Sequence, residues 1–286
     1  MTCLRMRAAL WAAALTILAV PGWAQTGPVE RGRYLVEGIV ACGNCHTPKG
    51  PDGRDLPGRN LAGGQVIEEP NLFRAVASNI TPDRETGIGN WTDAQLGRAI
   101  REGIRPDGSL IGPPMPFEFY RDISDSDLAA MIAYLRSLPA VSNRVERSRY
   151  SIPLPPAYGP PVASVPDPPA GDAVARGAYL AGPLGHCLDC HTPRGPDMQL
   201  QRQNLGAGGL PISGPWGVVV SRNITPHREE GIGAWTDEQV IAAITRAEAP
   251  GGRRLGPPMG YGYYARMNER DLRDVVAYLR SLPARP

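Results

Sequence analysis

The sequence predicts an all-α protein made of two tandem domains, each with about three helices and long loops. Three observations predict this architecture. The sequence contains an internal repeat with a period of about 145 residues. Apolar residues recur at helical spacing in each copy, and Thr-Asp-x-Gln sequences have the form of a helix-capping box. A repeat of this length indicates two duplicated domains, because the units of solenoid proteins run about 20–50 residues.

Four pairs of segments carry the repeat. "RGRYLVEGIVACGNCHTPKGPD" at 31–52 matches "RGAYLAGPLGHCLDCHTPRGPD" at 176–197, and "SNITPDRETGIGNWTDAQ" at 78–95 matches "RNITPHREEGIGAWTDEQ" at 222–239. "GPPMPFEFY" at 112–120 matches "GPPMGYGYY" at 256–264, and "AYLRSLPA" at 133–140 returns unchanged at 277–284.

These matches predict a first domain over 25–138 and a second over 172–286. Residues 139–171 separate them and contain nine prolines. Proline fixes φ and has no backbone donor, so this linker is expected to be extended. The sequence leaves open whether the linker is a free spacer or lies packed across both domains.

Three helices are expected in each copy. The first of them leads into the cysteines, as residues 30–40 do in the first copy. Residues 92–103 and 236–246 begin with the capping boxes "TDAQ" and "TDEQ", and residues 124–138 begin with "SDSD" and carry an apolar stripe. The segments 47–91 and 192–235 are rich in Gly and Pro and show little periodicity. We expect loops there, and loops of this length suit a domain whose core is filled by something other than side chains.

Residues 1–24 have the pattern of a secretory signal peptide: a basic start, an apolar run and small residues at its end. The alternative is an uncleaved membrane anchor, but the run is interrupted by Pro21 and is shorter than the roughly 20 residues that span a bilayer. We therefore expect an exported, soluble mature chain without a transmembrane segment. The full chain has 30 basic and 28 acidic residues, and loss of Arg5 and Arg7 with the signal leaves the mature chain formally neutral and without a basic block, which argues against nucleic-acid binding.

Two Cys-x-x-Cys-His motifs are the main candidates for function. They contain all the cysteines of the expected mature chain, namely Cys42 and Cys45 before His46, and Cys187 and Cys190 before His191. A zinc site would need four protein ligands, a thioredoxin-like dithiol would need a βαβ context, and a disulfide would not need the histidine. Cys-x-x-Cys-His is the attachment sequence of c-type haem, in which the two thiols form thioethers with one porphyrin and the imidazole binds its iron. We therefore predict two covalently attached haems.

The sixth iron ligand decides what such a haem does, because Met/His ligation favours electron transfer and an open site favours ligand binding. Only Met115 and Met259 occupy matching positions in the two copies, and we predict thioether ligation at both. Met131 is expected in the core. His186 and His227 are not duplicated and are expected at the surface, although His186, next to Cys187, could tune the second haem.

Three further pairs of repeated residues have two interpretations. They could donate hydrogen bonds near the haems, or they could simply fill loops and core. The pairs are Asn79 with Asn223, Trp91 with Trp235, and Tyr120 with Tyr264.

The motifs "CGNCHTP", "NITPDRETGIGNWTD", "GPPMPFEFY" and "SDLAAMIAYLRSLP", with their second copies, resemble the cytochrome c subunit of bacterial membrane-bound alcohol, aldehyde and gluconate dehydrogenases. The resemblance implies two tandem class I cytochrome c domains, all-α, with His/Met ligation. It also implies transfer of electrons from a dehydrogenase to a quinone or oxidase in the periplasm. Those subunits commonly carry three haems and a C-terminal membrane attachment, so two motifs favour a shorter diheme carrier. Arg59 and Gln203 stand where small class I cytochromes have the proline whose carbonyl bonds the proximal histidine, so that partner is not predicted.

The predicted function is thus a periplasmic diheme cytochrome, free or peripheral to the inner membrane, without a catalytic residue of its own. It would carry electrons from a periplasmic or membrane-bound dehydrogenase to a cytochrome or oxidase. The alternatives are a diheme enzyme of the peroxidase kind and a haem sensor, and both need one open iron.

Overall fold

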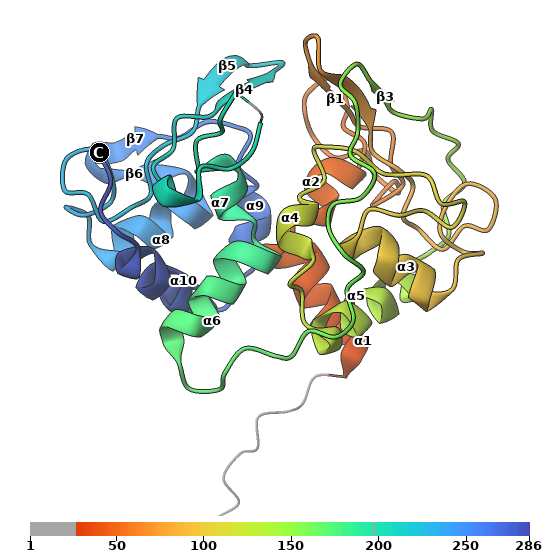
Figure 1. The fold of residues 1–286 in the computed structure, drawn as a ribbon, viewed down its shortest axis with the longest axis horizontal. Helices are drawn as coiled ribbons and strands as arrows, with labels where there is room; N and C mark the ends of the chain where they lie inside the picture. Colours follow the sequence, from red (N-terminus) through yellow and green to blue (C-terminus); the bar gives the residue numbers. More distant parts are fainter. Residues whose placement is uncertain (1–26, 197) are drawn as a thin grey trace, which may run out of the picture.

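The computed structural model describes residues 27–196 and 198–286, so the expected signal segment at 1–24 lies outside the described residues. Two groups of helices lie side by side, and β-hairpins extend from the same end of both groups (Figure 1).

Helices and strands follow nearly the same order in the two halves. The first half contains α1 (Pro28–Tyr34), the π-helix η1 (Leu35–Ile39), α2 (Cys42–His46), β1 (Val66–Glu69), β2 (Phe73–Val76), α3 (Asp93–Arg101), α4 (Phe117–Tyr120) and α5 (Asp125–Ser137), followed by β3 (Arg149–Tyr150) in the linker. The second half contains α6 (Ala173–Tyr179), the π-helix η2 (Leu180–Leu184), α7 (Cys187–Cys190), the 3₁₀ turn η3 (Arg202–Asn204), β4 (Pro211–Gly214), β5 (Gly217–Val220), α8 (Asp237–Arg246), β6 (Glu248–Ala249), the 3₁₀ turn η4 (Pro250–Gly252), β7 (Arg253–Arg254), α9 (Tyr261–Tyr264) and α10 (Glu269–Ser281).

The all-α prediction is wrong, because the described residues also form three small antiparallel sheets in the orders β1-β2-β3, β4-β5 and β6-β7. The β1–β2 and β4–β5 hairpins lie in the Gly- and Pro-rich segments that were expected to be loops. Strands of two to four residues are too short to show a periodicity in sequence. Pairing is nevertheless favoured because it satisfies backbone donors and acceptors that would otherwise be left without partners.

The predicted starts of α3 and α8 are confirmed, and both helices begin with a complete capping box. The backbone N–H of Gln95 donates to Thr92 Oγ1 over 3.2 Å, and the Thr92 N–H donates to Gln95 Oε1 over 2.8 Å. Thr236 and Gln239 repeat both bonds at the same distances. Each box satisfies two of the amides that a helix start leaves unpaired.

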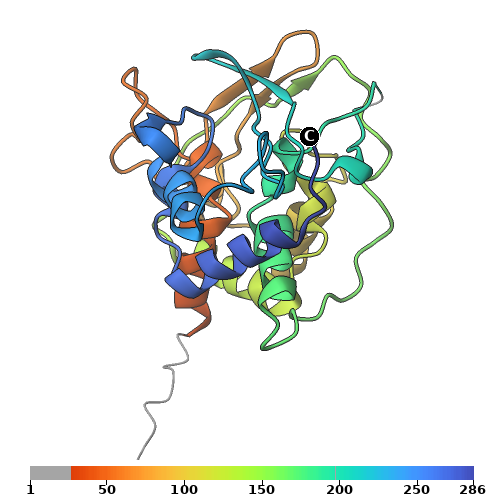
Figure 2. The same cartoon turned by 90° about the vertical axis from the view of Figure 1, so that its left-hand side faces the viewer.

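In each half the first helix packs against the last helix at a glycine. Figure 2 shows α10 crossing α6 in the second half. A Cβ on Gly32 of α1 would lie 1.9 Å from the carbonyl oxygen of Ala130 in α5, and a Cβ on Gly177 of α6 would lie 1.9 Å from that of Asp274 in α10. The backbones can therefore approach this closely only without a side chain. The crossing brings Arg31 within 2.8 Å of Asp127, an ion pair between the two helices.

The Pro-rich linker packs against the first half and is not a free spacer. The Val141 carbonyl accepts a hydrogen bond from Asn79 Nδ2 over 2.8 Å, and β3 pairs with β2. The ring of Tyr158 stacks on Phe117 with centroids 4.8 Å apart. The backbone N–H of Asp125, at the start of α5, donates to the Val165 carbonyl over 2.9 Å.

Gly32→Ala and Gly177→Ala should each lower the free energy of unfolding of the haem-loaded protein by about 1–3 kcal/mol or more, because the added methyl overlaps a backbone carbonyl that cannot rotate away. Denaturant titration followed by far-UV circular dichroism measures the loss. Gly262→Ala in α9 is the matched control, since a Cβ there meets no atom within 4 Å. Equal stability of Gly32→Ala and Gly262→Ala would contradict the close crossing.

Candidate haem-binding site

The two Cys-x-x-Cys-His motifs occupy the short helices α2 and α7. Each helix follows a residue in the left-handed conformation, Ala41 with φ 52° and His186 with φ 39°, which turns the chain out of the preceding π-helix. All four cysteines are free thiols.

Burial raises the pKa of these thiols. The pKa of Cys42 is raised to about 12, that of Cys187 to about 11 and that of Cys190 to about 12, in each case chiefly by desolvation. A catalytic dithiol needs a thiolate with a lowered pKa. The environment of these cysteines therefore argues against a redox dithiol.

Both motif histidines hold their rings by the same hydrogen bond. His46 Nδ1 lies 2.7 Å from the Ser78 carbonyl oxygen, and His191 Nδ1 lies 2.6 Å from that of Arg222. A carbonyl only accepts, so the proton is on Nδ1 and the lone pair of Nε2 is free for a metal. Burial lowers the pKa of both histidines, which keeps the imidazoles neutral, the form that ligates iron. Neither acceptor was predicted from sequence, because each is a backbone atom 31 or 32 residues away.

Glycines at positive φ bring the histidine and its acceptor segment together. The N–H of Gly63 donates to the His46 carbonyl over 2.7 Å, and that of Gly208 donates to the His191 carbonyl over 2.8 Å. A Cβ on Gly63 would lie 2.5 Å from the Asn79 nitrogen, directly after Ser78. The small residue thus lets the loop lie directly on the segment that orients the imidazole.

The donor set fits haem and does not fit a protein-ligated metal. Within residues 27–196 and 198–286, no three His, Cys, Asp or Glu side chains gather as a metal site. Each motif instead offers two thiols one helical turn apart and one neutral imidazole, which is the donor set of covalent haem attachment.

Met115 and Met259, the predicted sixth ligands, are partly buried and pack against the hydrophobic core. Met131 and Met267 are buried core residues, whereas Met198 is 48 % exposed. Met131 therefore has the core position that the sequence predicted.

The two histidines outside the motifs have structural contacts. His227 Nδ1 accepts the N–H of Glu230 over 3.1 Å and stabilises a turn. The expectation that His186 lies at the surface is wrong, because its ring packs against Tyr120 with centroids 5.7 Å apart. Since Tyr120 belongs to the first half, His186 joins the two halves.

The repeated asparagines serve loop structure. Asn79 Nδ2 donates to Thr86 Oγ1 over 3.1 Å and to the Val141 carbonyl over 2.8 Å, which uses both of its donors. Asn223 Nδ2 donates to the Arg285 carbonyl over 2.7 Å. Trp91 and Trp235 are partly buried against the core.

The two motifs approach each other across the interface between the halves. Tyr120 is buried, and its pKa is raised by desolvation and by the nearby thiols of Cys42 and Cys45. Tyr264 is its counterpart: desolvation and three thiols, those of Cys187, Cys190 and Cys45, raise its pKa. Cys45 of the first half also contributes to the raised pKa of Cys190 in the second. Tyr120 and Tyr264 lie at the interface between the halves, since α4, which carries Tyr120, contacts η2, and α9, which carries Tyr264, contacts η1.

A pair of tyrosine–aspartate hydrogen bonds connects the halves in a nearly two-fold manner. Tyr34 Oη donates to Asp271 Oδ2 over 2.7 Å, and Tyr179 Oη donates to Asp127 Oδ2 over 2.9 Å. Each hydroxyl also accepts the N–H of the residue that caps the last helix of the other half, Asn268 over 3.2 Å and Ser124 over 3.1 Å. Each tyrosine therefore connects the first helix of one half to the last helix of the other.

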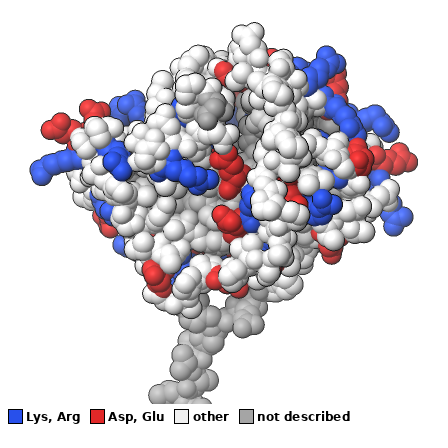
Figure 3. All heavy atoms as spheres, in the orientation of Figure 1, with Lys and Arg blue, Asp and Glu red and all other residues white. Residues whose placement is uncertain are grey.

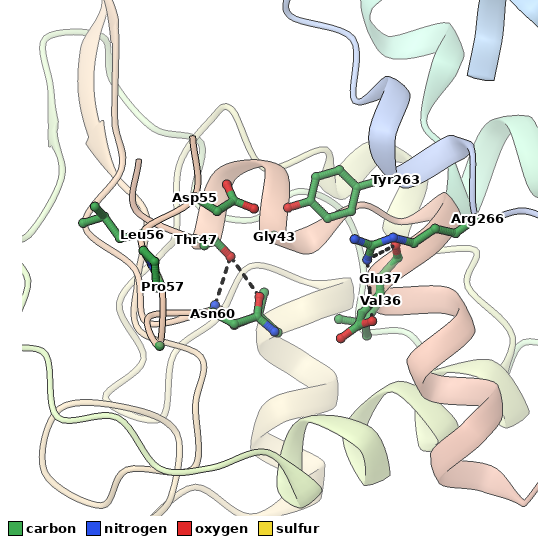
Figure 4. Close-up of a pocket in the computed structure, with 12 residues that line it drawn as sticks. Val36, Glu37, Gly43, Thr47, Asp55, Leu56, Pro57, Asn60, Tyr263 and Arg266 are labelled. Carbon is green, nitrogen blue, oxygen red and sulfur yellow. Dashed lines mark hydrogen bonds and ion pairs between the residues drawn. The ribbon is translucent and has the colours of Figure 1, made fainter. Parts of the chain in front are cut away.

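A pocket of about 250 Å³ lies at the same interface. Figure 4 shows Tyr263 and Arg266 reaching from the second half toward α2 of the first. Arg266 pairs with Glu37 over 3.5 Å, and Thr47 Oγ1 donates to Asn60 Oδ1 over 3.1 Å. The pocket is therefore a polar part of the seam between the halves, behind the first motif.

These two Cys-x-x-Cys-His helices, each with an oriented neutral histidine, have the pattern by which c-type cytochromes hold haem. Residues 174–283 match the cytochrome c family. The chain is 31 % identical over 277 residues to the cytochrome c subunit of an alcohol dehydrogenase (quinone) from Gluconobacter oxydans, which covers 90 % of this chain and 55 % of that protein. It is 32 % identical to the fructose dehydrogenase cytochrome subunit of Gluconobacter japonicus, covering 93 % of this chain and 54 % of that protein.

A third relative is a diheme c-type cytochrome from Cereibacter sphaeroides, 28 % identical over 91 % of this chain and 87 % of its own length. The second half of the chain belongs to the cytochrome c family, and the chain as a whole resembles the cytochrome c subunits of dehydrogenases. Its cofactors are two covalently attached c-type haems. The chain spans about half the length of the first two relatives.

Tyr34→Phe and Tyr179→Phe should each lower the free energy of unfolding by about 1.5–3 kcal/mol, because each removes a hydrogen bond to a buried carboxylate and leaves a capping amide without its partner. The loss in the double variant should depart from the sum of the single losses, since Arg31 lies over the ring of Tyr34 and also pairs with Asp127, the partner of Tyr179. Denaturant titration of the holoprotein measures this. Tyr150→Phe is the control, since its hydroxyl has no hydrogen bond within the described residues, and a loss there equal to that of Tyr34→Phe would contradict the assignment.

Proposed function

We propose that this protein is an exported electron carrier whose two haems are held by the two motifs. Cys42 and Cys45 would attach the first haem and His46 would bind its iron, and Cys187, Cys190 and His191 would do the same for the second. The observation that carries the proposal is the repeated hydrogen bond from histidine Nδ1 to a backbone carbonyl, which leaves Nε2 of both histidines free for iron.

The bound haems supply one-electron chemistry at iron. The protein supplies the oriented neutral histidines, the thiols for attachment and, at Met115 and Met259, a thioether for the sixth position. Thioether ligation raises the reduction potential and leaves no open coordination position. The carbonyl partners of His46 and His191 make the imidazoles more basic, which tunes the potential from outside the ligand set.

The symmetry of the two sites favours a carrier over a diheme enzyme or a haem sensor. An enzyme or sensor needs one open iron, and the two halves would then differ at the sixth ligand. Here both candidate methionines pack in the same way against the core, and the two histidines have equivalent acceptors.

The proposed electron donor is a dehydrogenase, because the relatives are named as cytochrome subunits of alcohol, fructose and gluconate dehydrogenases. A cytochrome or an oxidase would be the acceptor. We place the chain in the periplasm, exported by the segment at 1–24, with domains over 25–138 and 172–286 and the linker over 139–171. In the described ranges, none of the helices combines the length and the apolar character needed to cross a bilayer.

The proposal is tested by expressing the protein in a periplasm with haem-maturation machinery, counting covalent haems and recording the ferric spectrum. We expect two haems per chain, both low-spin, with the weak far-red band of a thioether–iron bond. A high-spin component from one haem would instead favour the enzyme or sensor.

Met115→Ala and Met259→Ala should each lower the potential of one haem by on the order of 0.1 V and open that haem to carbon monoxide, because thioether ligation favours the reduced iron. Redox titration with carbon monoxide difference spectra measures both effects. Met267→Leu, in the core, is the control and should leave the reduction potentials of both haems unchanged. An unchanged spectrum for either alanine variant would remove that methionine from the ligand set.

The double variant Cys42→Ala/Cys45→Ala should retain one covalent haem per chain, and Cys187→Ala/Cys190→Ala should retain the other. The reason is that each pair of thiols forms the thioethers of one porphyrin only. Intact mass spectrometry counts the haems. Two haems on either variant would contradict the attachment sites.

A further inference from the structure

We propose that the outer edge of β5, residues Gly217–Val220, is a docking site at which an extended segment of a partner protein adds as a third strand. This proposal concerns the surface of the second half and does not depend on the electron-transfer function.

The first half shows the same site with its strand in place. There β2 lies between β1 and β3, and β3 belongs to the Pro-rich linker. Phe73 pairs with Tyr150 and Arg74 with Arg149. The backbone N–H of Val76 donates to Ser148 Oγ over 3.0 Å, so the linker covers the outer edge of β2 along its length.

The second hairpin has the same register but no third strand among the described residues. Val66 pairs with Val76 in the first half, and Pro211 pairs with Val220 in the second. Val76 is 9 % exposed, whereas Val220 is 59 % exposed and Val218 67 %. The same strand position is thus buried in one half and bare in the other.

The bare edge offers backbone groups as well as apolar side chains. The N–H of Ser221 bonds the Leu210 carbonyl over 2.9 Å, inside the hairpin. Bonded and non-bonded pairs alternate in an antiparallel ladder, so the backbone groups of Val218 and Val220 point outward. The other side of the hairpin faces the first half, because Ser213 Oγ of β4 donates to Glu69 Oε1 of β1 over 3.0 Å.

The hydrogen bonds that anchor the start of the linker in the first half have equivalents at Arg285 in the second half. Asn223 Nδ2 donates to the Arg285 carbonyl over 2.7 Å, and Arg285 N–H donates to Thr225 Oγ1 over 3.1 Å. Val141 makes the equivalent bonds at the start of the linker in the first half, to Asn79 over 2.8 Å and Thr81 over 3.2 Å. The anchor of the linker is thus repeated in the second half, and within residues 27–196 and 198–286 no strand pairs with the outer edge of β5.

Charge indicates the chemistry of the occupant. Arg74 of β2 pairs with Glu146 of the linker over 3.0 Å, but Val218 stands at the equivalent place in β5. No charged residue occurs from Leu210 to Val220, and Trp216 at the turn is 42 % exposed. In Figure 3 the charged side chains gather on the flanks of this face, and its upper part is mostly uncharged.

Edge strands are usually protected by a charge, a proline or a covering segment, and β5 has none of these within the described residues. The occupant that fits is therefore an extended polypeptide without charge at the residues facing Val218 and Val220. It would be held by main-chain hydrogen bonds, as in other cases of strand addition.

The test supplies such a strand from within the chain. In a chimera, Pro286 is replaced by the sequence of residues 142–152, because Arg285 occupies the place of Val141, and Glu146 and Arg149 of the graft are changed to valine. The amide hydrogens of Val218 and Val220 in the holoprotein should exchange at least about tenfold more slowly than in the parent, because the tethered strand pairs with them. Unchanged exchange would overturn the proposal.

Two variants separate strand pairing from simple apolar contact. Val218→Pro removes an outward N–H without breaking a bond to β4, whereas Val218→Thr keeps that N–H and the β-branched shape. The chimera should lose the protection of Val220 with Val218→Pro and keep it with Val218→Thr. Equal loss in both variants would overturn the assignment of a strand site.

Two measurements on the parent protein examine other occupants of this edge. Sedimentation should show a monomer, and a dimer that Val218→Pro abolishes would make the occupant a second copy of this chain instead of a partner. Binding to anionic vesicles that Val218→Asp abolishes and Val218→Pro preserves would make the surface a lipid contact. Either result would overturn the proposal.

Discussion

The close crossing of the first and last helices, made possible by a glycine in each half, is the constraint on which the rest of the structure depends. Because Gly32 and Gly177 have no side chain, each first helix lies directly on a backbone carbonyl of the last. This contact directs the chain through a π-helix into the short helix that carries the motif. It also places Tyr34 and Tyr179 where they can reach the aspartates of the opposite half. A single small residue thus supports both the fold of each half and the joint between them.

The joint brings the two haem-attachment motifs together. Cys45 lies close enough to the second motif to affect the pKa of Cys190 and Tyr264, and His186 packs on Tyr120. The two motifs are therefore held by one interface and not at the ends of a flexible linker. The proline-rich segment that could have separated the halves is instead packed on the first half.

The two halves share their internal design and differ at their surfaces. The capping boxes, the crossing glycines and the histidine acceptors recur at equivalent places. In contrast, Arg74 and its covering linker in the first half correspond to the bare Val218 in the second. The surroundings of the two motifs are therefore repeated, whereas the hairpin edge is covered in the first half and exposed in the second. The two related cytochrome subunits from Gluconobacter are longer proteins, and this chain spans about half of their length.

The sequence by itself determined the features that depend on neighbouring residues. The Thr-x-x-Gln capping boxes, the helices they start, the Cys-x-x-Cys-His motifs and the repeat could all be predicted, because spacing of a few residues decides them. The hairpins, the acceptors of the two histidines, the position of His186 and the path of the linker could not. Each of these is decided by backbone groups far apart in sequence: Ser78 meets His46 only after Gly63 has turned the loop back, and the linker reaches β2 from more than 70 residues away. A backbone carbonyl carries no signature in the sequence, so only the tertiary structure could assign these partners.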